Sequence, residues 1–257
     1  MTASGSSQKP SLLDSIKSDW RELSGELWGK KAYIAKALAA TIVFLVLQVA
    51  FQLYFAGAST LPVAMLRAYA LAGATLIGAA LCLGPLANFK PQWNFIEYRR
   101  TIGVAGFALV YLHAIAVIVT YFNSNPAGIY YDLNPFRNPI IFGSIALGVF
   151  SLLLLTSTDW AISKLGFRNW KSLHRLIYPA FVLSVLHFVE INPPLMFTLP
   201  GYLLLAVTLA AMVMQLAGYA RKVQAGKAGA GALVGIAFTV VSLLLFAVAF
   251  FFKNLVA

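Results

Sequence analysis

Long apolar runs alternate with short polar or basic segments along the whole chain. Seven runs of roughly 17–25 residues are each long enough to cross a bilayer as a helix; they are expected near 37–56, 68–87, 102–122, 138–156, 173–190, 197–217 and 231–252. Connections such as "NFKPQWNFIEYRR" and "YARKVQAGKAGAG" are rich in charge and turn residues. The pattern predicts an all-α integral membrane protein, a bundle of about seven transmembrane helices.

The first 36 residues follow a different pattern. In "SLLDSIKSDWRELSGELWGKK", apolar side chains recur at helical spacing among charged ones, which is typical of an amphipathic helix on a membrane surface. Such a helix anchors the chain or, alternatively, docks a soluble partner. We therefore expect a cytoplasmic segment with a surface helix over 1–36, a transmembrane domain over 37–217, and a cytoplasmic loop plus an extra helix over 218–257.

Composition and charge placement support this reading. Hydrophobic residues make up 60% of the chain and charged residues 11%, whereas soluble proteins carry about 25% charge. The net charge is +11, and sixteen of the nineteen lysines and arginines fall in the N-terminal segment and in alternate connections. The positive-inside rule then predicts a multi-pass inner-membrane protein with a cytoplasmic N-terminus. Because the basic residues set topology, they do not call for a nucleic-acid partner.

Two of the three histidines lie inside apolar runs. His113 and His187 fall in runs expected to cross in the same direction, each roughly 18–21 Å from the cytoplasmic end at about 1.5 Å per residue. Two imidazoles at one depth can hold a metal between them, and haem iron commonly accepts axial histidine. Three alternatives stay open: hydrogen bonds from the rings to each other or to the backbone, another metal, or a proton relay.

His174, the third histidine, lies about 20 Å from His187 along a helix, at the cytoplasmic mouth of the same run. That depth suits a second cofactor, although thirteen residues turn the two rings onto different faces of a straight helix. Pro179 lies between them and is expected to kink the helix. With no fourth histidine, a second bis-histidine site is impossible. Zinc is disfavoured because structural zinc takes four ligands, and Cys82 is the single cysteine.

Three arginines flank these positions. Arg99 and Arg100 precede the run that contains His113, and Arg175 follows His174 directly. Guanidinium groups bind carboxylates through paired donors, so these side chains are candidates for haem propionates or a quinone carbonyl. The alternative role is a positive-inside anchor.

Several stretches resemble one family, among them "EYRRTIGVAGFALVYLHAIAVIVTYF" and "LTSTDWAISKLGFRNWKSLHRLIY". They are similar to the MsrQ (YedZ) family, the haem-binding membrane subunit of the methionine-sulfoxide reductase system, within the ferric-reductase-like transmembrane superfamily. The resemblance implies a six-helix core with non-covalent haem b, one or two per chain. It places that family's three-histidine pattern on His113, His174 and His187, and its double arginine on Arg99 and Arg100.

The resemblance also implies a function. A b-type cytochrome of this kind passes electrons from a cytoplasmic flavin reductase or quinol to an acceptor outside, in that family a periplasmic enzyme that reduces oxidised methionine in proteins. The N-terminal extension and the run 231–252 have no counterpart in short family members, which weakens the transfer of the partner.

No nicotinamide site is recognisable. The glycines of "GKAGAGALVG" (226–235) follow a membrane helix, whereas the dinucleotide fingerprint follows a strand. A quinone or FMN is therefore expected only from a donor. The resemblance implies an electron-transfer subunit of an oxidoreductase system, and whether the chain is an enzyme by itself stays open. Two rival functions stay open: a stand-alone transmembrane ferric reductase, and a proton-relay carrier without haem.

Overall fold

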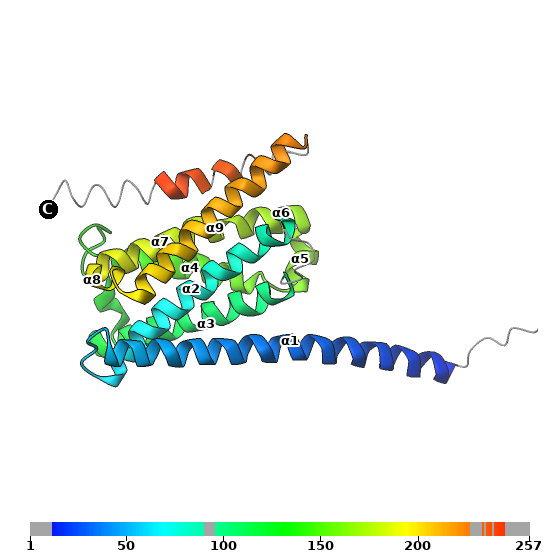
Figure 1. Ribbon diagram of the computed structural model, residues 1–257, viewed down its shortest axis with the longest axis horizontal. Coiled ribbons are helices and arrows are strands. Elements are labelled where there is room, and N and C mark those ends of the chain that lie inside the picture. The colour runs from blue at the N-terminus through cyan, green and yellow to red at the C-terminus, as the bar shows by residue number, and fades with distance from the viewer. Residues whose placement is uncertain (1–11, 90–95, 227–232, 234, 238, 245–257) are drawn as a thin grey trace, which may run out of the picture.

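The computed structural model describes residues 12–89, 96–226, 233, 235–237 and 239–244, and for 12–31, 88, 96, 97 and 159 it describes the backbone alone. Helices follow one another throughout this part of the chain, and it contains no strand. In order they are α1 (Leu12–Tyr54), α2 (Leu61–Phe89), α3 (Ile96–Tyr121), η1 (Pro126–Tyr130), α4 (Ile140–Leu155), α5 (Asp159–Leu165), α6 (Phe167–Leu173), η2 (His174–Leu176), α7 (Ile177–Ile191), α8 (Pro193–Met196) and α9 (Leu199–Gln224). The all-α prediction is confirmed (Figure 1).

Five helical segments within the described residues are long and apolar enough to cross a membrane: Ala32–Tyr54, Leu61–Ala87, Tyr98–Tyr121, Phe167–Ile191 and Leu199–Gln224. α4 is a shorter apolar helix of 16 residues. These six coincide with the first six predicted runs, so the chain is a multi-pass membrane protein. Most of the seventh run, 231–252, lies outside the described residues, which retain a short apolar helix between Gly235 and Leu244.

The N-terminal segment does not form a helix separate from the first span. α1 runs without a break for 43 residues, because no proline or turn dipeptide interrupts the chain between Leu27 and Ala37. The side chains of the expected amphipathic face lie outside the described residues, so that face remains a prediction.

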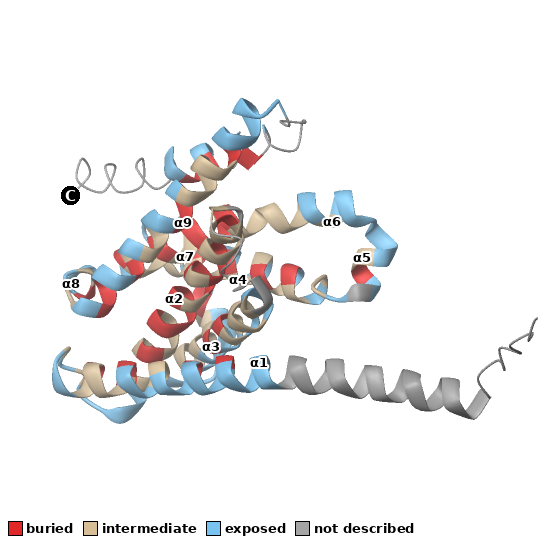
Figure 2. Cartoon of the chain, turned by 45° about the vertical axis from the view of Figure 1, so that its right-hand side comes forward, coloured by how far each residue is buried: buried red, intermediate tan, exposed pale blue. Residues whose placement is uncertain are grey.

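The apolar core lies between α2, α4, α7 and α9 (Figure 2). α7 supplies most of it, including Phe181 and Val185, which are fully buried. α3 packs along α2, where a side chain on Gly73 would lie 2.8 Å from the carbonyl oxygen of Gly106. Small residues therefore allow the two helices to approach closely at this crossing.

α1 meets α2 and α3 through an inward face that carries little apolar surface. Its buried described residues are Ala37, Thr41, Gln48 and Gln52, spaced so that they share one side of the helix. Gln52 is 0% exposed, and neither atom of its side-chain amide has a hydrogen-bond partner among the described residues. The apolar side chains of α1 face outward instead, as expected for a helix surrounded by lipid.

The basic connections gather at one end of the bundle, where α5 and α6 lie beside the start of α3 and the end of α9 (Figure 1). The Thr158 hydroxyl accepts a hydrogen bond from the backbone N–H of Ala161, and Gly166, with φ of 74°, ends α5. The irregularity expected at Pro179 occurs just before it, as the 3₁₀ turn η2, since proline provides no backbone N–H. This turn carries His174 to the end of the bundle.

Candidate functional site

The structure brings two histidines from different helices close together, with one ring edge-on to the other. His113 lies on α3 and His187 on α7, and their ring centroids are 6.3 Å apart with the ring planes at 64°. Both rings are half-buried. Their proximity agrees with the equal depth calculated from helical rise, so the sequence spacing predicts this pair correctly.

A backbone carbonyl fixes each ring. Nδ1 of His113 lies 3.0 Å from the carbonyl oxygen of Leu66 on α2, and Nδ1 of His187 lies 3.0 Å from that of Pro139, the residue before α4. A neutral imidazole that donates from Nδ1 keeps its lone pair on Nε2. Both rings are therefore held in the tautomer in which Nε2 can bind a metal.

The first turn of α4 also shapes the space around His187. A Cβ on Gly143 would lie 3.0 Å from Cγ and Nδ1 of the imidazole, closer than the 3.5–4.0 Å of ordinary carbon contacts. Gly143 thus lets the ring lie against α4 while Pro139, one turn earlier, accepts its hydrogen bond. No pattern in the sequence pointed to either residue.

The spacing of the two rings suits one ion between them. Metal–imidazole nitrogen bonds are about 2 Å long and each nitrogen lies about 1 Å from its ring centre, so imidazoles on opposite sides of one ion have centroids roughly 6 Å apart. Among the described residues, no three His, Cys, Asp or Glu side chains are placed to hold a metal. The two imidazoles alone leave the other coordination positions of such an ion to a bound group, and a haem would supply them.

A second site lies nearer the basic end of the bundle. A cavity of about 800 Å³ opens between α2, α3, α4, α6, α7 and α9. It brings together four of the six predicted site residues: Arg99, Arg100, His174 and Arg175. His113 and His187 do not line it, so the predicted residues form two separate groups.

His174 is held at the edge of this cavity by two neighbours. Its Nε2 lies 3.1 Å from the hydroxyl oxygen of Thr156, and the indole of Trp170 is 4.2 Å from its ring centroid. The Thr156 hydroxyl donates to the carbonyl oxygen of Leu152, so its oxygen accepts from Nε2–H of His174. In that arrangement Nδ1 is the nitrogen of His174 with a lone pair.

The cavity is basic. Arg99 lies over Gly84, with Nη1 3.2 Å from where a Cβ would be, and Arg100 donates to the carbonyl oxygen of Ser157. Lys171 and Lys222 also line the cavity, and none of its described lining residues is acidic. Such a space favours an anionic ligand, because paired guanidinium donors bind carboxylates.

Other lining residues escaped the sequence analysis. Tyr178, Gln215 and Tyr219 face the same cavity, and Tyr178 and Tyr219 are buried. Tyr178 and Gln215 lie in apolar runs and Tyr219 begins a polar connection, places where a tyrosine or glutamine is unremarkable. Only helix packing places them beside residues more than forty positions away.

Comparison with known proteins places the chain in a family. The family model described as "Ferric reductase like transmembrane component" matches residues 55–185, half of the chain. The chain therefore belongs to the ferric-reductase-like transmembrane component family. The match includes His113 and His174 and ends two residues before His187.

Individual relatives agree with the predicted resemblance. Proteins from Brucella anthropi and Brucella ovis, both named protein-methionine-sulfoxide reductase heme-binding subunit MsrQ, are 38% identical to this chain over 96 and 97 residues. The matches cover 37% of this chain and 42% and 43% of the relatives, so the chain spans less than half the length of these relatives. No solved structure matches.

Proposed function

We propose that this protein is a b-type cytochrome that carries electrons across the membrane, with haem bound between His113 and His187. The observation that supports it is the anchored pair of imidazoles, 6.3 Å apart, each with Nδ1 bonded to a backbone carbonyl. The relatives named as heme-binding subunits support the same cofactor. Bound haem would supply one-electron chemistry at its iron.

The chain contributes position and exclusion of water. The carbonyl oxygens of Leu66 and Pro139 hold Nδ1–H of the two rings and leave the lone pair on Nε2, the nitrogen that would bind the iron. The buried side chains of α7, such as Leu186 directly before His187, keep the surroundings apolar. In a low-dielectric site of this kind, the histidine ligands and their hydrogen bonds would have a larger effect on the redox potential of bound haem.

The proposal includes a second haem in the basic cavity, bound by His174. The volume of about 800 Å³ lies within the range of cofactor pockets, about 300–1,000 Å³. Arg99, Arg100 and Arg175 would bind the propionate carboxylates. His174 would ligate through Nδ1 while Nε2–H stays on Thr156, and the opposite position has no histidine.

Direction and partners follow from the basic end and from the relatives. We place that end on the cytoplasmic side of the inner membrane. A flavin reductase or quinol would then deliver electrons near the basic cavity, and the His113–His187 site would pass them outward. The relatives' name, protein-methionine-sulfoxide reductase heme-binding subunit, supports an oxidoreductase subunit as the acceptor, and the outward direction of transfer would place that subunit in the periplasm.

The test is a reduced-minus-oxidised spectrum with pyridine-haemochrome quantitation of the purified protein and of His113→Ala, His187→Ala and His174→Ala. Two haems in the parent chain are expected, with the first two variants losing the same haem and the third losing the other. If the parent chain binds only one haem and the His174→Ala variant keeps it, the proposal of a second haem site is wrong. A parent chain without a chromophore, expressed with ample haem, would refute the cytochrome and favour the proton relay.

A stand-alone ferric reductase would also transfer electrons through haem, and it would differ in its electron acceptor. It would reduce ferric chelates at the outer face with no protein partner. Reconstituted, chemically reduced protein that oxidises only in the presence of a periplasmic reductase would exclude this alternative.

A further inference from the structure

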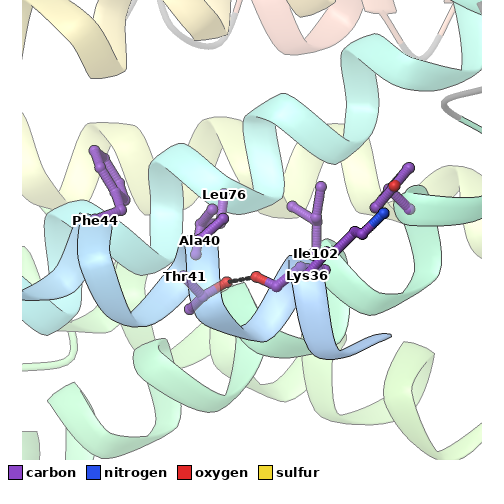
Figure 3. A pocket seen from close by; sticks show the side chains of 8 residues that line it. Lys36, Ala40, Thr41, Phe44, Leu76 and Ile102 are labelled. Atoms are coloured by element: carbon purple, nitrogen blue, oxygen red, sulfur yellow. Dashed lines mark hydrogen bonds between the residues drawn. The ribbon is translucent and has the colours of Figure 1, made fainter. Parts of the chain in front are cut away.

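A second cavity lies on the other side of α3 from the basic one. It is a groove of about 290 Å³ between α1, α2 and α3, with Ala40 and Phe44 on α1, Leu76 on α2 and Ile102 on α3 among its walls (Figure 3). Two adjacent residues of α3 line different cavities: Tyr98 lines the groove and Arg99 lines the basic cavity. The groove is therefore a separate site.

Most of the groove lining is apolar. Apart from Lys36 and Tyr98, the one polar side chain in it is Thr41, whose hydroxyl already donates to the carbonyl oxygen of Ala37 at 2.9 Å (Figure 3). A ligand carbonyl beside Thr41 would therefore lose its bonds to water without gaining a donor there. The floor thus fits a hydrocarbon chain.

One end of the groove carries a charge. Figure 3 shows Lys36 at one end of the row of lining side chains and Phe44 at the other, and Lys36 is exposed. Eight residues of helix separate them, roughly 12 Å, which approaches one leaflet of a hydrocarbon core about 30 Å thick. Lys36 lies toward the basic end of the bundle, because Tyr98, beside Arg99, lines the same groove.

We propose that this groove binds one acyl chain of an anionic phospholipid, whose phosphate is held by Lys36. The chain would lie against Ala40, Phe44 and Leu76, in the leaflet at the basic end. Basic pockets between transmembrane helices bind such head groups. The lipid would fill the seam where α1, whose buried face is short of apolar side chains, meets the bundle. The proposal is independent of haem binding.

The experiment measures which lipids stay with the protein. Wild type and variants are reconstituted in vesicles of equal phosphatidylglycerol and phosphatidylethanolamine and repurified in mild detergent, and the retained lipids are quantified by mass spectrometry. Wild type should retain phosphatidylglycerol in preference. Lys36→Gln should lower the ratio of the two retained lipids about fivefold, the effect of one lysine near a membrane surface. Lys164→Gln, a basic-end lysine that does not line the groove, is the matched control and should keep the ratio.

Filling the groove tests the acyl chain separately. Ala40→Phe, or Ala40→Leu if the larger side chain prevents folding, should lower total retained lipid, whereas Lys36→Gln should change mainly its identity. Three outcomes would overturn the proposal: no lipid retained by the wild type, retention of a neutral isoprenoid quinone instead, or equal losses in Lys36→Gln and Lys164→Gln. Haem content is measured in the same samples, so a failed cytochrome proposal and a failed lipid proposal remain distinguishable.

Discussion

Replacing Gly143 by alanine should disturb the His113–His187 site from outside it. The new Cβ would lie 3.0 Å from Cγ and Nδ1 of His187 and 3.2 Å from Cδ2. Carbon contacts are comfortable at about 3.5–4.0 Å, so the ring must move by roughly 0.5–1 Å. Nδ1 of His187 is already at 3.0 Å from the Pro139 carbonyl oxygen, and this displacement would stretch or break that hydrogen bond.

The size of the effect follows from these two changes. Overpacking of a tight site costs about 1–3 kcal/mol, and a lost hydrogen bond costs about 0.5–1.5 kcal/mol. Loss of a second-sphere partner lowers metal affinity by about 10–100-fold. We therefore expect Gly143→Ala to bind haem at this site 10–100-fold more weakly, while the haem proposed at His174 stays bound.

The assay compares haem occupancy, the rate of haem loss to excess apomyoglobin, and the midpoint potential. Gly148→Ala is a matched control on the same helix, because a Cβ there would have no atom within 4 Å. It should leave all three quantities unchanged. Equal haem-loss rates and potentials in Gly143→Ala and Gly148→Ala would refute the placement of His187 as an axial ligand held by α4.

Three further predictions concern stability and local order. Gln52→Leu should stabilise the protein by about 1–3 kcal/mol, because neither atom of the buried amide has a partner in the part of the chain that the structure describes; a lower melting temperature would instead reveal a bound water or ligand. Gly106→Ala should destabilise the α2–α3 crossing by about 1–3 kcal/mol, since its Cβ would lie 2.8 Å from the Gly73 carbonyl oxygen, and Gly218→Ala, with open space, should not. Thr158→Ala should cost α5 about 0.5–2 kcal/mol through its lost N-cap, seen as faster hydrogen exchange in α5; unchanged exchange would show that the cap is dispensable.

Apolar length and charge placement predicted the helices because a bilayer leaves few alternatives for a run of about 20 apolar residues. Six predicted runs correspond to helices in the structure. The junction between the surface segment and the first span could not be predicted, since "WGKKAYIAK" is equally compatible with a bend and with the continuous helix that forms. The local sequence there favours a helix, but packing and the membrane decide whether that helix bends or continues straight.

Only the depth of the two histidines in the candidate site could be predicted, from the helical rise per residue. Rise along each helix placed His113 and His187 at one depth. It could not reveal that Leu66 and Pro139, which lie 47 and 48 residues from those histidines, supply the oxygen atoms that orient them. Any residue has a backbone carbonyl, so composition contains no trace of these partners.

Backbone carbonyls are suitable partners at this depth for a physical reason. A carboxylate could orient an imidazole equally well, but a charge in the hydrocarbon region is costly, whereas a carbonyl is neutral and already present. The two anchors also lie within separate helix pairs, since His113 is tied from α3 to α2 and His187 from α7 to the start of α4. Among the described helices, each of these four makes its most extensive contact with the other member of its pair, so each pair can orient its own imidazole. A ligand bound by both rings would then join halves that are already organised, which lowers the ordering that binding must impose.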